Sequence, residues 1–373
     1  MTTHIAGIPL EEWKALYRQL DRFAHLAPWQ WMEEAQIFGV QDPETGTVHY
    51  ISIVGGEDEL PVLLLFSGDE GWHTYWTLME FAVEAGTIPD EVAFTMPMLI
   101  ATWGEEDSLL PAERELIREL NITPTPWGWP VVRDFRPGWA PWYPDREGVR
   151  LLTLALKEGL HVAEHLRDMD TDTLLKHLEQ GEVLVRVPRQ QDDGIHWENV
   201  WYPMPEEEEQ PYRIRIPADA LDQLRHMLPN LSEVQVDFFM LPTGVQEEED
   251  ERPYIPFLLL VVDGESGEPL VVDLLRVQES IRHMYEHLPG RIVQELVKAQ
   301  VRPARFRVRS ERLQALLEPV AQELNAELVK SSSLRALDRI RIHLLEKIVG
   351  AGEGMPQGMF SVQPTNQSNP EQN

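Results

Sequence analysis

Apolar and polar positions alternate along the chain with two periods, one typical of helices and one typical of strands. Apolar residues spaced three and four apart predict amphipathic helices, whereas short apolar runs bounded by Gly, Pro or Asp predict strands. In the first half the pattern predicts helices at 10–25, 72–85, 111–120, 146–167 and 172–179, and strands at 37–41, 47–54, 61–67, 91–96, 183–187, 195–200 and 212–216.

The second half predicts a similar succession. It has helices at 218–227, 311–324 and 333–348, one or two helices within 277–299 broken near Pro289, and strands at 233–240, 256–262, 269–275, 304–308 and 326–329. Both halves therefore read as three strands, a helix, a strand and a helix. Two equivalent helices end in the same Glu-Leu-Asn, at 119–121 and 323–325. We expect a repeat of topology rather than of sequence.

Tryptophan and proline usage suggest where the domains divide. All twelve Trp lie between Trp13 and Trp201, and residues 122–144 hold six Pro and four Trp. Because proline lacks a backbone donor, we expect this stretch to be a non-regular strap packed on the first domain. The predicted organisation is an N-terminal α/β unit at 1–121, the strap and helices at 122–180, bridging strands and a helix at 181–230, a C-terminal unit at 231–350 and a disordered tail at 351–373.

Length and charge restrict the class of protein. The chain has 373 residues, more than one core usually holds, and 63 Asp and Glu against 32 Lys and Arg give a net charge of −31. Such a surface repels phosphates, so we expect a protein partner rather than nucleic acid. The lack of cysteine excludes disulfides and thiolate zinc sites. With no long apolar run and no signal-peptide pattern, we expect a soluble cytoplasmic protein that does not enter a membrane.

Three segments of the second half follow one order of strands, with helices after them: VQVDF (234–238), PFLLLVVDGESGEPLVVDLL (256–275) and RPARFRVRS (302–310). With them the second half resembles an integrase or transposase core of the ribonuclease H-like fold, which has three antiparallel strands followed by helix, strand, helix, strand and helix. The expected fold class is therefore α/β with mixed sheets, built of two ribonuclease H-like units in tandem, both degenerate.

This resemblance implies catalytic carboxylates on the first strand, at the end of the fourth strand and on the last helix. Asp237 stands at the first position, but Arg309 follows the fourth strand, and Asp338 or Glu346 would be the third group. An arginine in that place would repel the divalent ions that two-metal chemistry needs. We therefore expect a non-catalytic copy, in which Asp237 is either a remnant catalytic residue or a polar residue on an outward strand face.

Three further segments carry a second resemblance: LAPWQW (26–31), VRDFRPGWAPWYPDREGVRLLTLAL (132–156) and RPARFRVRSERLQALLEPVAQELNAEL (302–328). Through them the whole chain resembles an uncharacterised bacterial family of paired domains of unknown function. The resemblance implies no activity, but it implies that the two halves belong to one architecture.

One helix carries a possible metal motif. His161, Glu164 and His165 spell H-x-x-E-H, the inverted zinc-protease motif, in which two His at i and i+4 share a helix face. The apolar stripe of this helix lies on its other side. We therefore expect both histidines to face solvent and to bind no metal.

Two further groups are candidates for binding. Arg305, Arg307 and Arg309 alternate with apolar residues, so their guanidinium groups line one face of a strand. They could bind phosphate, a nucleic-acid backbone or an acidic partner; we favour internal pairing with the acidic loop 247–251. Trp139 and Trp142 could belong to an aromatic platform for a sugar, a base or a proline-rich peptide, or could seal the edge of a core.

The chain has no nucleotide-binding glycine motif and no serine in a nucleophile elbow, so no cofactor is expected. Our leading hypothesis is a non-enzymatic interaction or scaffold protein. The alternative is a nucleic-acid-processing or nucleic-acid-binding protein of ribonuclease H-like type, and a zinc hydrolase using the His161 helix is a more distant one.

Overall fold

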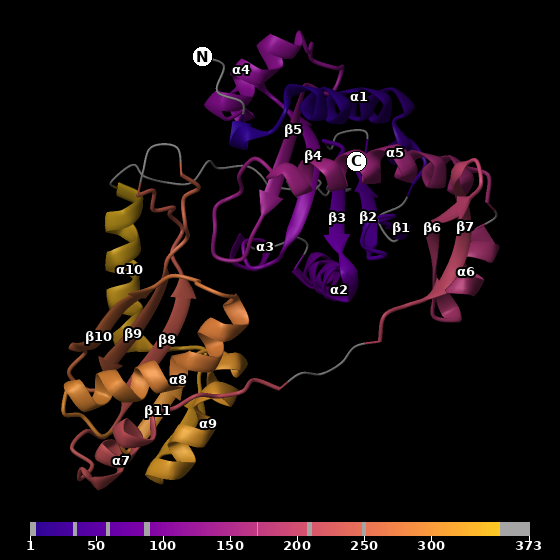
Figure 1. The fold of residues 1–373 in the computed structure, drawn as a ribbon. Helices are drawn as coiled ribbons and strands as arrows, with labels where there is room; N and C mark the ends of the chain where they lie inside the picture. The colour runs from indigo at the N-terminus through magenta and orange to yellow at the C-terminus, as the bar shows by residue number, and fades with distance from the viewer. Residues whose placement is uncertain are drawn as a thin grey trace, which may run out of the picture. The chain divides into compact units, whose positions relative to one another are not determined.

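The chain forms two compact units, each with its own sheet. The computed structural model describes residues 5–32, 36–56, 60–85, 90–169, 171–206, 211–247 and 251–350. The first unit contains the described residues up to 136 and from 141 to 206, and the second contains residues 137–140 and those from 211 onward. Both sheets are mixed and both carry helices, which confirms a two-domain mixed α/β fold (Figure 1). The predicted disordered tail lies outside the described residues.

The first unit is a seven-stranded sheet with helices on both faces. Its helices are α1 (Leu10–Leu26), α2 (Gly68–Ala85), α3 (Asp90–Ala93), α4 (Pro111–Leu120), α5 (Arg146–Arg167) and α6 (Thr171–Glu179). Its strands are β1 (Phe38–Gln41), β2 (Val48–Val54), β3 (Val62–Ser67), β4 (Met98–Gly104), β5 (Trp129–Phe135), β6 (Glu182–Gln191) and β7 (Gly194–Pro203), in the order β5-β4-β3-β2-β1-β6-β7.

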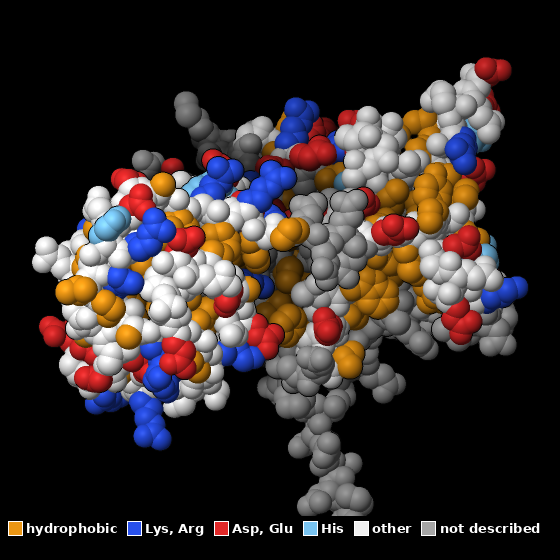
Figure 2. All heavy atoms as spheres, turned by 90° about the horizontal axis from the view of Figure 1, so that it is seen from below, with side chains coloured by type: hydrophobic (Ala, Val, Ile, Leu, Met, Phe, Trp, Pro, Cys, Tyr) orange, Lys and Arg blue, Asp and Glu red, His pale blue; other side chains and the backbone are white. Residues whose placement is uncertain are grey.

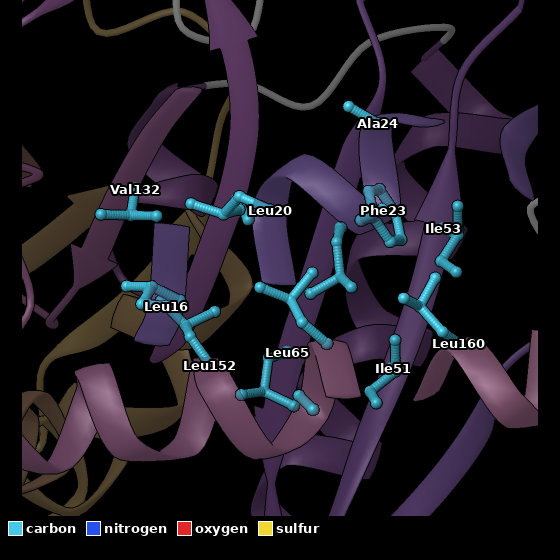
Figure 3. Packing of buried hydrophobic residues seen from close by; sticks show 14 of the residues in the cluster. Leu16, Leu20, Phe23, Ala24, Ile51, Ile53, Leu65, Val132, Leu152 and Leu160 are labelled. Atoms are coloured by element: carbon cyan, nitrogen blue, oxygen red, sulfur yellow. The ribbon is translucent and has the colours of Figure 1, made fainter. Parts of the chain in front are cut away.

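The core of this unit lies between the sheet and two long helices. Leu16, Leu20 and Phe23 of α1 and Leu152 of α5 pack on the strands through Ile51 and its neighbours (Figure 3). Helix α2 covers the opposite face of β2 and β3 (Figure 1). The spacing of the α1 residues is the helical stripe seen in the sequence, which explains why this helix was predicted from pattern alone.

The second unit is a five-stranded sheet in the order β10-β9-β8-β11-β12. Its strands are β8 (Val234–Met240), β9 (Phe257–Asp263), β10 (Pro269–Leu275), β11 (Arg305–Val308) and β12 (Glu327–Lys330). Its helices are α7 (Ala218–His226), α8 (Ile281–Lys298), α9 (Glu311–Leu324) and α10 (Arg335–Gly350). Strands β8, β9 and β10 are antiparallel, whereas β11 is parallel to both β8 and β12.

The two faces of this second sheet have different covers. Val234, Val236 and Phe306 face a core formed with α7, α8 and α9. The intervening positions of the strands face α10, where Phe239 and Leu260 lie in a smaller apolar cluster with the start of that helix. Because side chains alternate along a strand, every second residue of β8 is directed toward α10.

The predicted repeat of topology holds only in part. In each unit three antiparallel strands are joined by a later strand parallel to the first, β6 beside β1 and β11 beside β8, but the strand that comes fourth along the chain takes different places. In the first unit β4 is antiparallel to β3 and lies at its outer side, and β1 pairs in parallel with β6. In the second unit the fourth strand, β11, lies beside the first, β8. Element order along the chain does not fix which strand edge a later strand joins. The expected bridge 181–230 is divided, since β6 and β7 complete the first sheet and α7 belongs to the second unit.

Three predicted elements also differ. The strand expected at 91–96 is instead α3 and a turn, and β4 begins after Pro97. The run 212–216 is extended but joins neither sheet; its Arg213 and Arg215 N–H groups donate to the side chain and carbonyl of Glu286. Helix α8 continues through Pro289 without a break. The Glu286 carbonyl, in the turn before this proline, accepts the Arg215 N–H from outside the helix.

The strap at 122–144 is more regular than expected, because it contains β5. This strand pairs with β4 and forms one edge of the first sheet. Pro130 lies in it, opposite Trp103. An edge strand tolerates proline because one side of its backbone needs no partner.

The turn between β1 and β2 is fastened to α5 by a buried carboxylate. Asp42 accepts hydrogen bonds from the Glu44 N–H and the Thr45 hydroxyl, and Arg150 donates to both of its oxygens at 3.1 and 2.6 Å. The hydrogen bonds from Arg150 lower the pKa of Asp42 to about 2. Asp263 makes an equivalent turn between β9 and β10, with the Glu265 N–H and the Ser266 hydroxyl as donors.

We predict that Asp42 contributes to acid sensitivity. Its pKa in the folded chain lies below the unfolded value, so its stabilisation, about 2 kcal/mol, is complete above about pH 4 and is lost as the pH falls toward 2. Urea unfolding of the wild type and Asp42→Asn should therefore differ at pH 5, and the difference should be much smaller near pH 2.5. Asp263→Asn is the matched control and should show a smaller difference at pH 5. Equal effects of the two substitutions would contradict the role given to Arg150.

Candidate functional site

The face of β8 that is directed toward α10 carries the residues on which the functional hypotheses depend. Asp237 is only 4% exposed. The alternative expectation, that Asp237 lies on an outward strand face, is therefore wrong, because α10 covers that face. One of its carboxylate oxygens accepts hydrogen bonds from Arg309 Nε at 3.0 Å and from an Arg341 nitrogen at 3.2 Å.

Arg309 joins the three positions that the ribonuclease H-like resemblance singles out. It follows β11, which lies beside β8, and it donates to Asp237 on β8 and to Asp338 on α10. A third donation goes to the Ser332 carbonyl at 2.9 Å. Partial burial disfavours the charged guanidinium, but the hydrogen bonds to the two carboxylates outweigh it, and the pKa of Arg309 is raised.

The neighbouring positions of β8 also hold α10. The Gln235 side-chain oxygen accepts the N–H groups of Ala336 and Leu337 at 3.1 Å each, in the first turn of the helix. These N–H groups have no partner within their own helix, so the glutamine caps it from the sheet. Phe239 lies under the Arg341 guanidinium, 4.2 Å from the ring centre. Gln235, Asp237 and Phe239, at alternate positions, thus bind one helix; we call this set with Arg309, Asp338 and Arg341 the α10 docking site.

The charges of the docking site balance one another. Two carboxylates, Asp237 and Asp338, meet two guanidinium groups, Arg309 and Arg341. The other proposed third carboxylate, Glu346, makes no contact with this set in the interactions that the structure records. Within the described residues no group of three or more His, Asp or Glu side chains is arranged to hold a metal ion.

The remaining arginines of β11 are also paired with carboxylates of the second unit. Arg305 contacts Glu327 at 2.7 Å and Glu233 at 3.5 Å, and Arg307 contacts Glu233 at 2.9 Å. We had favoured the acidic loop 247–251 as the partner. Residues 248–250 lie outside the described residues, and Glu247 contacts Arg276 instead. The arginines therefore pair within the sheet, with carboxylates at the starts of β8 and β12.

Trp139 and Trp142 are engaged separately. Trp139 belongs to the second unit, where the Arg276 guanidinium lies 4.6 Å from its ring centre and 4.4 Å from that of Tyr254. Trp142 belongs to the first unit, where its backbone bonds twice to Asp134 and its ring contacts Tyr143. The contacts recorded for the Trp139 ring thus lie in the second unit, and the contact recorded for the Trp142 ring lies in the first.

The histidine pair lies on the outer face of α5, as expected. His161, Glu164 and His165 are all exposed, and the nearest ionic contact of His161 is Glu164 at 3.8 Å.

Over the molecular face in Figure 2, acidic and basic side chains are interspersed rather than gathered by sign. Among the described residues no helix is long and apolar enough to cross a membrane.

The structure defines a two-domain α/β protein, and the family comparisons divide the chain into the same two domains. A domain of unknown function (DUF7309) matches residues 13–186, and a second domain of unknown function (DUF6930) matches residues 220–345. The chain is a tandem of these two domains, which confirms the predicted paired family. No curated protein and no solved structure matches the chain.

Sequence reasoning found Asp237, Arg309 and Asp338 but missed Gln235 and Arg341. The signal for Gln235 was available, because it is a polar residue two positions before Asp237 in an otherwise apolar strand. Arg341 had no comparable signal, since α10 carries three other basic residues, Arg335, Arg339 and Lys347.

We predict that Arg309 stabilises the second unit far more than Arg305 does. Arg309→Met leaves Asp237 buried with one partner fewer and should lower the free energy of unfolding by about 3 kcal/mol, the lower end of the range for a broken buried pair, since Arg341 remains. Arg305→Met removes a pair that is exposed to solvent and should leave the unfolding midpoint close to wild type. Urea unfolding followed by circular dichroism measures both. Equal destabilisation would contradict the assignment.

We predict that the histidine pair is dispensable for folding and metal content. His161→Ala/His165→Ala should change the free energy of unfolding by no more than ~0.5 kcal/mol, as surface substitutions usually do. Elemental analysis of the purified chain should find no stoichiometric zinc. Zinc that is present in the wild type and absent in this variant would restore the hydrolase hypothesis.

Proposed function

We propose that this chain is a non-enzymatic interaction or scaffold protein, and that its second unit is a degenerate copy of a ribonuclease H-like core. The observation that carries the proposal is the position of Arg309. Its guanidinium lies between Asp237 and Asp338, two of the carboxylates that would have to converge on metal ions in an active enzyme of this type.

The strand order supports the second part of the proposal. A first-strand carboxylate and a group after the fourth strand can meet only if those strands are neighbours. In this unit β11 lies beside β8, with Arg307 opposite Gln235, and α10 follows β12. The arrangement brings the three expected positions together, and an arginine occupies the middle one.

The electrostatics of the site support the absence of catalysis. Two-metal chemistry uses carboxylates to neutralise two divalent ions, whereas here two guanidinium groups already neutralise both carboxylates. A cation approaching Asp237 would have to displace Arg309 and Arg341. Two contacts that hold α10 would be lost with them, Arg309 to Asp338 and Arg341 to Asp237. The cost of leaving a guanidinium partly buried and unpaired opposes that exchange.

The nucleic-acid alternative has less support in this geometry. Binding of a phosphate backbone by the β11 arginines would require guanidinium groups with no carboxylate partner. Arg305, Arg307 and Arg309 each contact a carboxylate of the second unit, and the whole chain carries a charge of −31. We therefore favour a protein partner.

The proposal predicts that divalent cations neither stabilise the chain nor support cleavage. With Mg²⁺ or Mn²⁺ the wild type should leave single-stranded DNA, double-stranded DNA and RNA intact, and its melting temperature should not rise. Arg309→Asp replaces the guanidinium with a third carboxylate. This variant should melt lower than wild type without cations and regain stability on addition of Mn²⁺.

Two outcomes would overturn the proposal. One is cation-dependent cleavage by the wild type that disappears in Asp237→Asn and in the more exposed Asp338→Asn. The other is a rise in the wild-type melting temperature with Mn²⁺ as large as that of Arg309→Asp. Cleavage that persists in both Asn variants would instead indicate a contaminating nuclease. The prediction that the wild type itself leaves nucleic acid intact would then stand.

A further inference from the structure

The outermost strand of the second sheet exposes apolar side chains. Strand β10 ends the strand order, with β9 on one side and no described strand on the other (Figure 1). Val272 and Leu274 are 56% and 62% exposed. A strand in this position presents unpaired N–H and C=O groups along its outer side, a template for another strand.

These two residues extend the surface on which α10 packs. Val272 lies opposite Leu260 of β9 and Leu274 opposite Leu258, and both β9 residues are buried in the cluster beneath α10. Helix α10 packs on β8 and β9. It therefore leaves the β10 part of the same apolar face open.

Only one end of β10 carries the features that usually protect an edge. Proline, bulges and charged side chains discourage pairing at sheet edges. Pro269 and an irregular register between Pro269 and Val271 protect the start of the strand. From Val271 to Leu275 the pairing with β9 is regular, and the one charged residue is Asp273, which accepts a hydrogen bond from Arg291 Nε at 2.7 Å.

We propose that β10 pairs antiparallel with β10 of a second copy of this chain, joining two five-stranded sheets into one. The regular segment 271–275 is symmetric about Asp273 in its apolar pattern. An antiparallel pair centred on this residue places Val272 of each copy opposite Leu274 of the other. It also places Val271 opposite Leu275, so every cross-strand pair except the central one is apolar.

The central pair is complementary in charge because of Arg291. Two Asp273 carboxylates opposite one another would repel, but each already accepts a hydrogen bond from an Arg291 that is itself partly exposed. Arg291 also contacts Glu295, which pairs with Lys298, so in each copy the two carboxylates, Asp273 and Glu295, are balanced by two cations, Arg291 and Lys298. A two-fold interface requires such self-complementarity.

The net charge of −31 on each copy opposes this association at long range. Salt screens that repulsion more than it weakens the apolar pairs, so the dimer should tighten as ionic strength rises. This inference goes beyond the proposed function and does not depend on it, because an enzyme could form the same dimer.

Sedimentation equilibrium of the full chain tests the interface. At moderate salt the wild type should approach twice the 43.0 kDa chain mass as its concentration rises. Val272→Lys/Leu274→Lys should remain at the mass of one chain at every concentration. Because both positions are exposed, its melting temperature should match that of the wild type at dilutions where the wild type is monomeric. The control Leu228→Lys, at a position 85% exposed in the same unit, should still dimerise. A wild type that stays monomeric at all concentrations and salts, or a double variant that dimerises, overturns the proposal.

Disulfide cross-linking tests the register of the two β10 strands. Because the native chain has no cysteine, only the introduced cysteines can react. Directly opposed residues of antiparallel strands have Cα atoms about 5 Å apart, within disulfide reach. Val272→Cys and Leu274→Cys should each fail to form a covalent dimer alone and should form one when the two proteins are mixed under oxidant. Efficient cross-linking of either variant alone, or none in the mixture, would overturn the register centred on Asp273.

Discussion

The buried carboxylate of Asp237 is the constraint on which the second unit depends. A charge that is 4% exposed must be neutralised within the protein, and the groups that neutralise it come from a loop after β11 and from α10. Because Arg341 of α10 is one of these groups, neutralising Asp237 fixes where α10 lies on the sheet. The same helix is capped by Gln235, two positions earlier on β8. One short strand thus determines the position of a 16-residue helix through polar contacts rather than through apolar burial alone.

Local signals in the sequence located the elements whose ends are determined locally. Helices 111–120, 146–167 and 311–324 begin and end where they were predicted. The last of these starts after Ser310, whose hydroxyl accepts the Leu313 N–H, and ends at Asn325 in the left-handed conformation. Asn121 ends α4 in the same way, which explains the shared Glu-Leu-Asn. Caps and C-terminal asparagines act within a few residues, so sequence reveals them.

Features that depend on distant partners were not accessible in this way. The sequence of the 122–144 strap showed that it is rich in Pro and Trp. It did not show that part of the strap pairs with β4, because pairing depends on which sheet edge is open. Asp237 was recognised as unusual, yet nothing in its neighbours along the chain indicates that a helix a hundred residues later covers it. The same holds for the arginines of β11. Their alternation showed that they share a face, whereas their partners Glu233 and Glu327 come from the two flanking strands.

A guanidinium and a metal ion solve the same electrostatic problem with different consequences. Both neutralise converging carboxylates, but an ion exchanges with solvent and leaves an open coordination position for substrate, whereas an arginine is part of the chain and fills its position permanently. A site closed by Arg309 holds α10 on the sheet independently of the cation supply. It also leaves Asp237 and Asp338 bound to guanidinium groups rather than free to bind a cation. Under the proposed function, the position that would serve chemistry in an active ribonuclease H-like enzyme instead holds α10 in place, and recognition is assigned to surfaces that stay open, such as the outer side of β10.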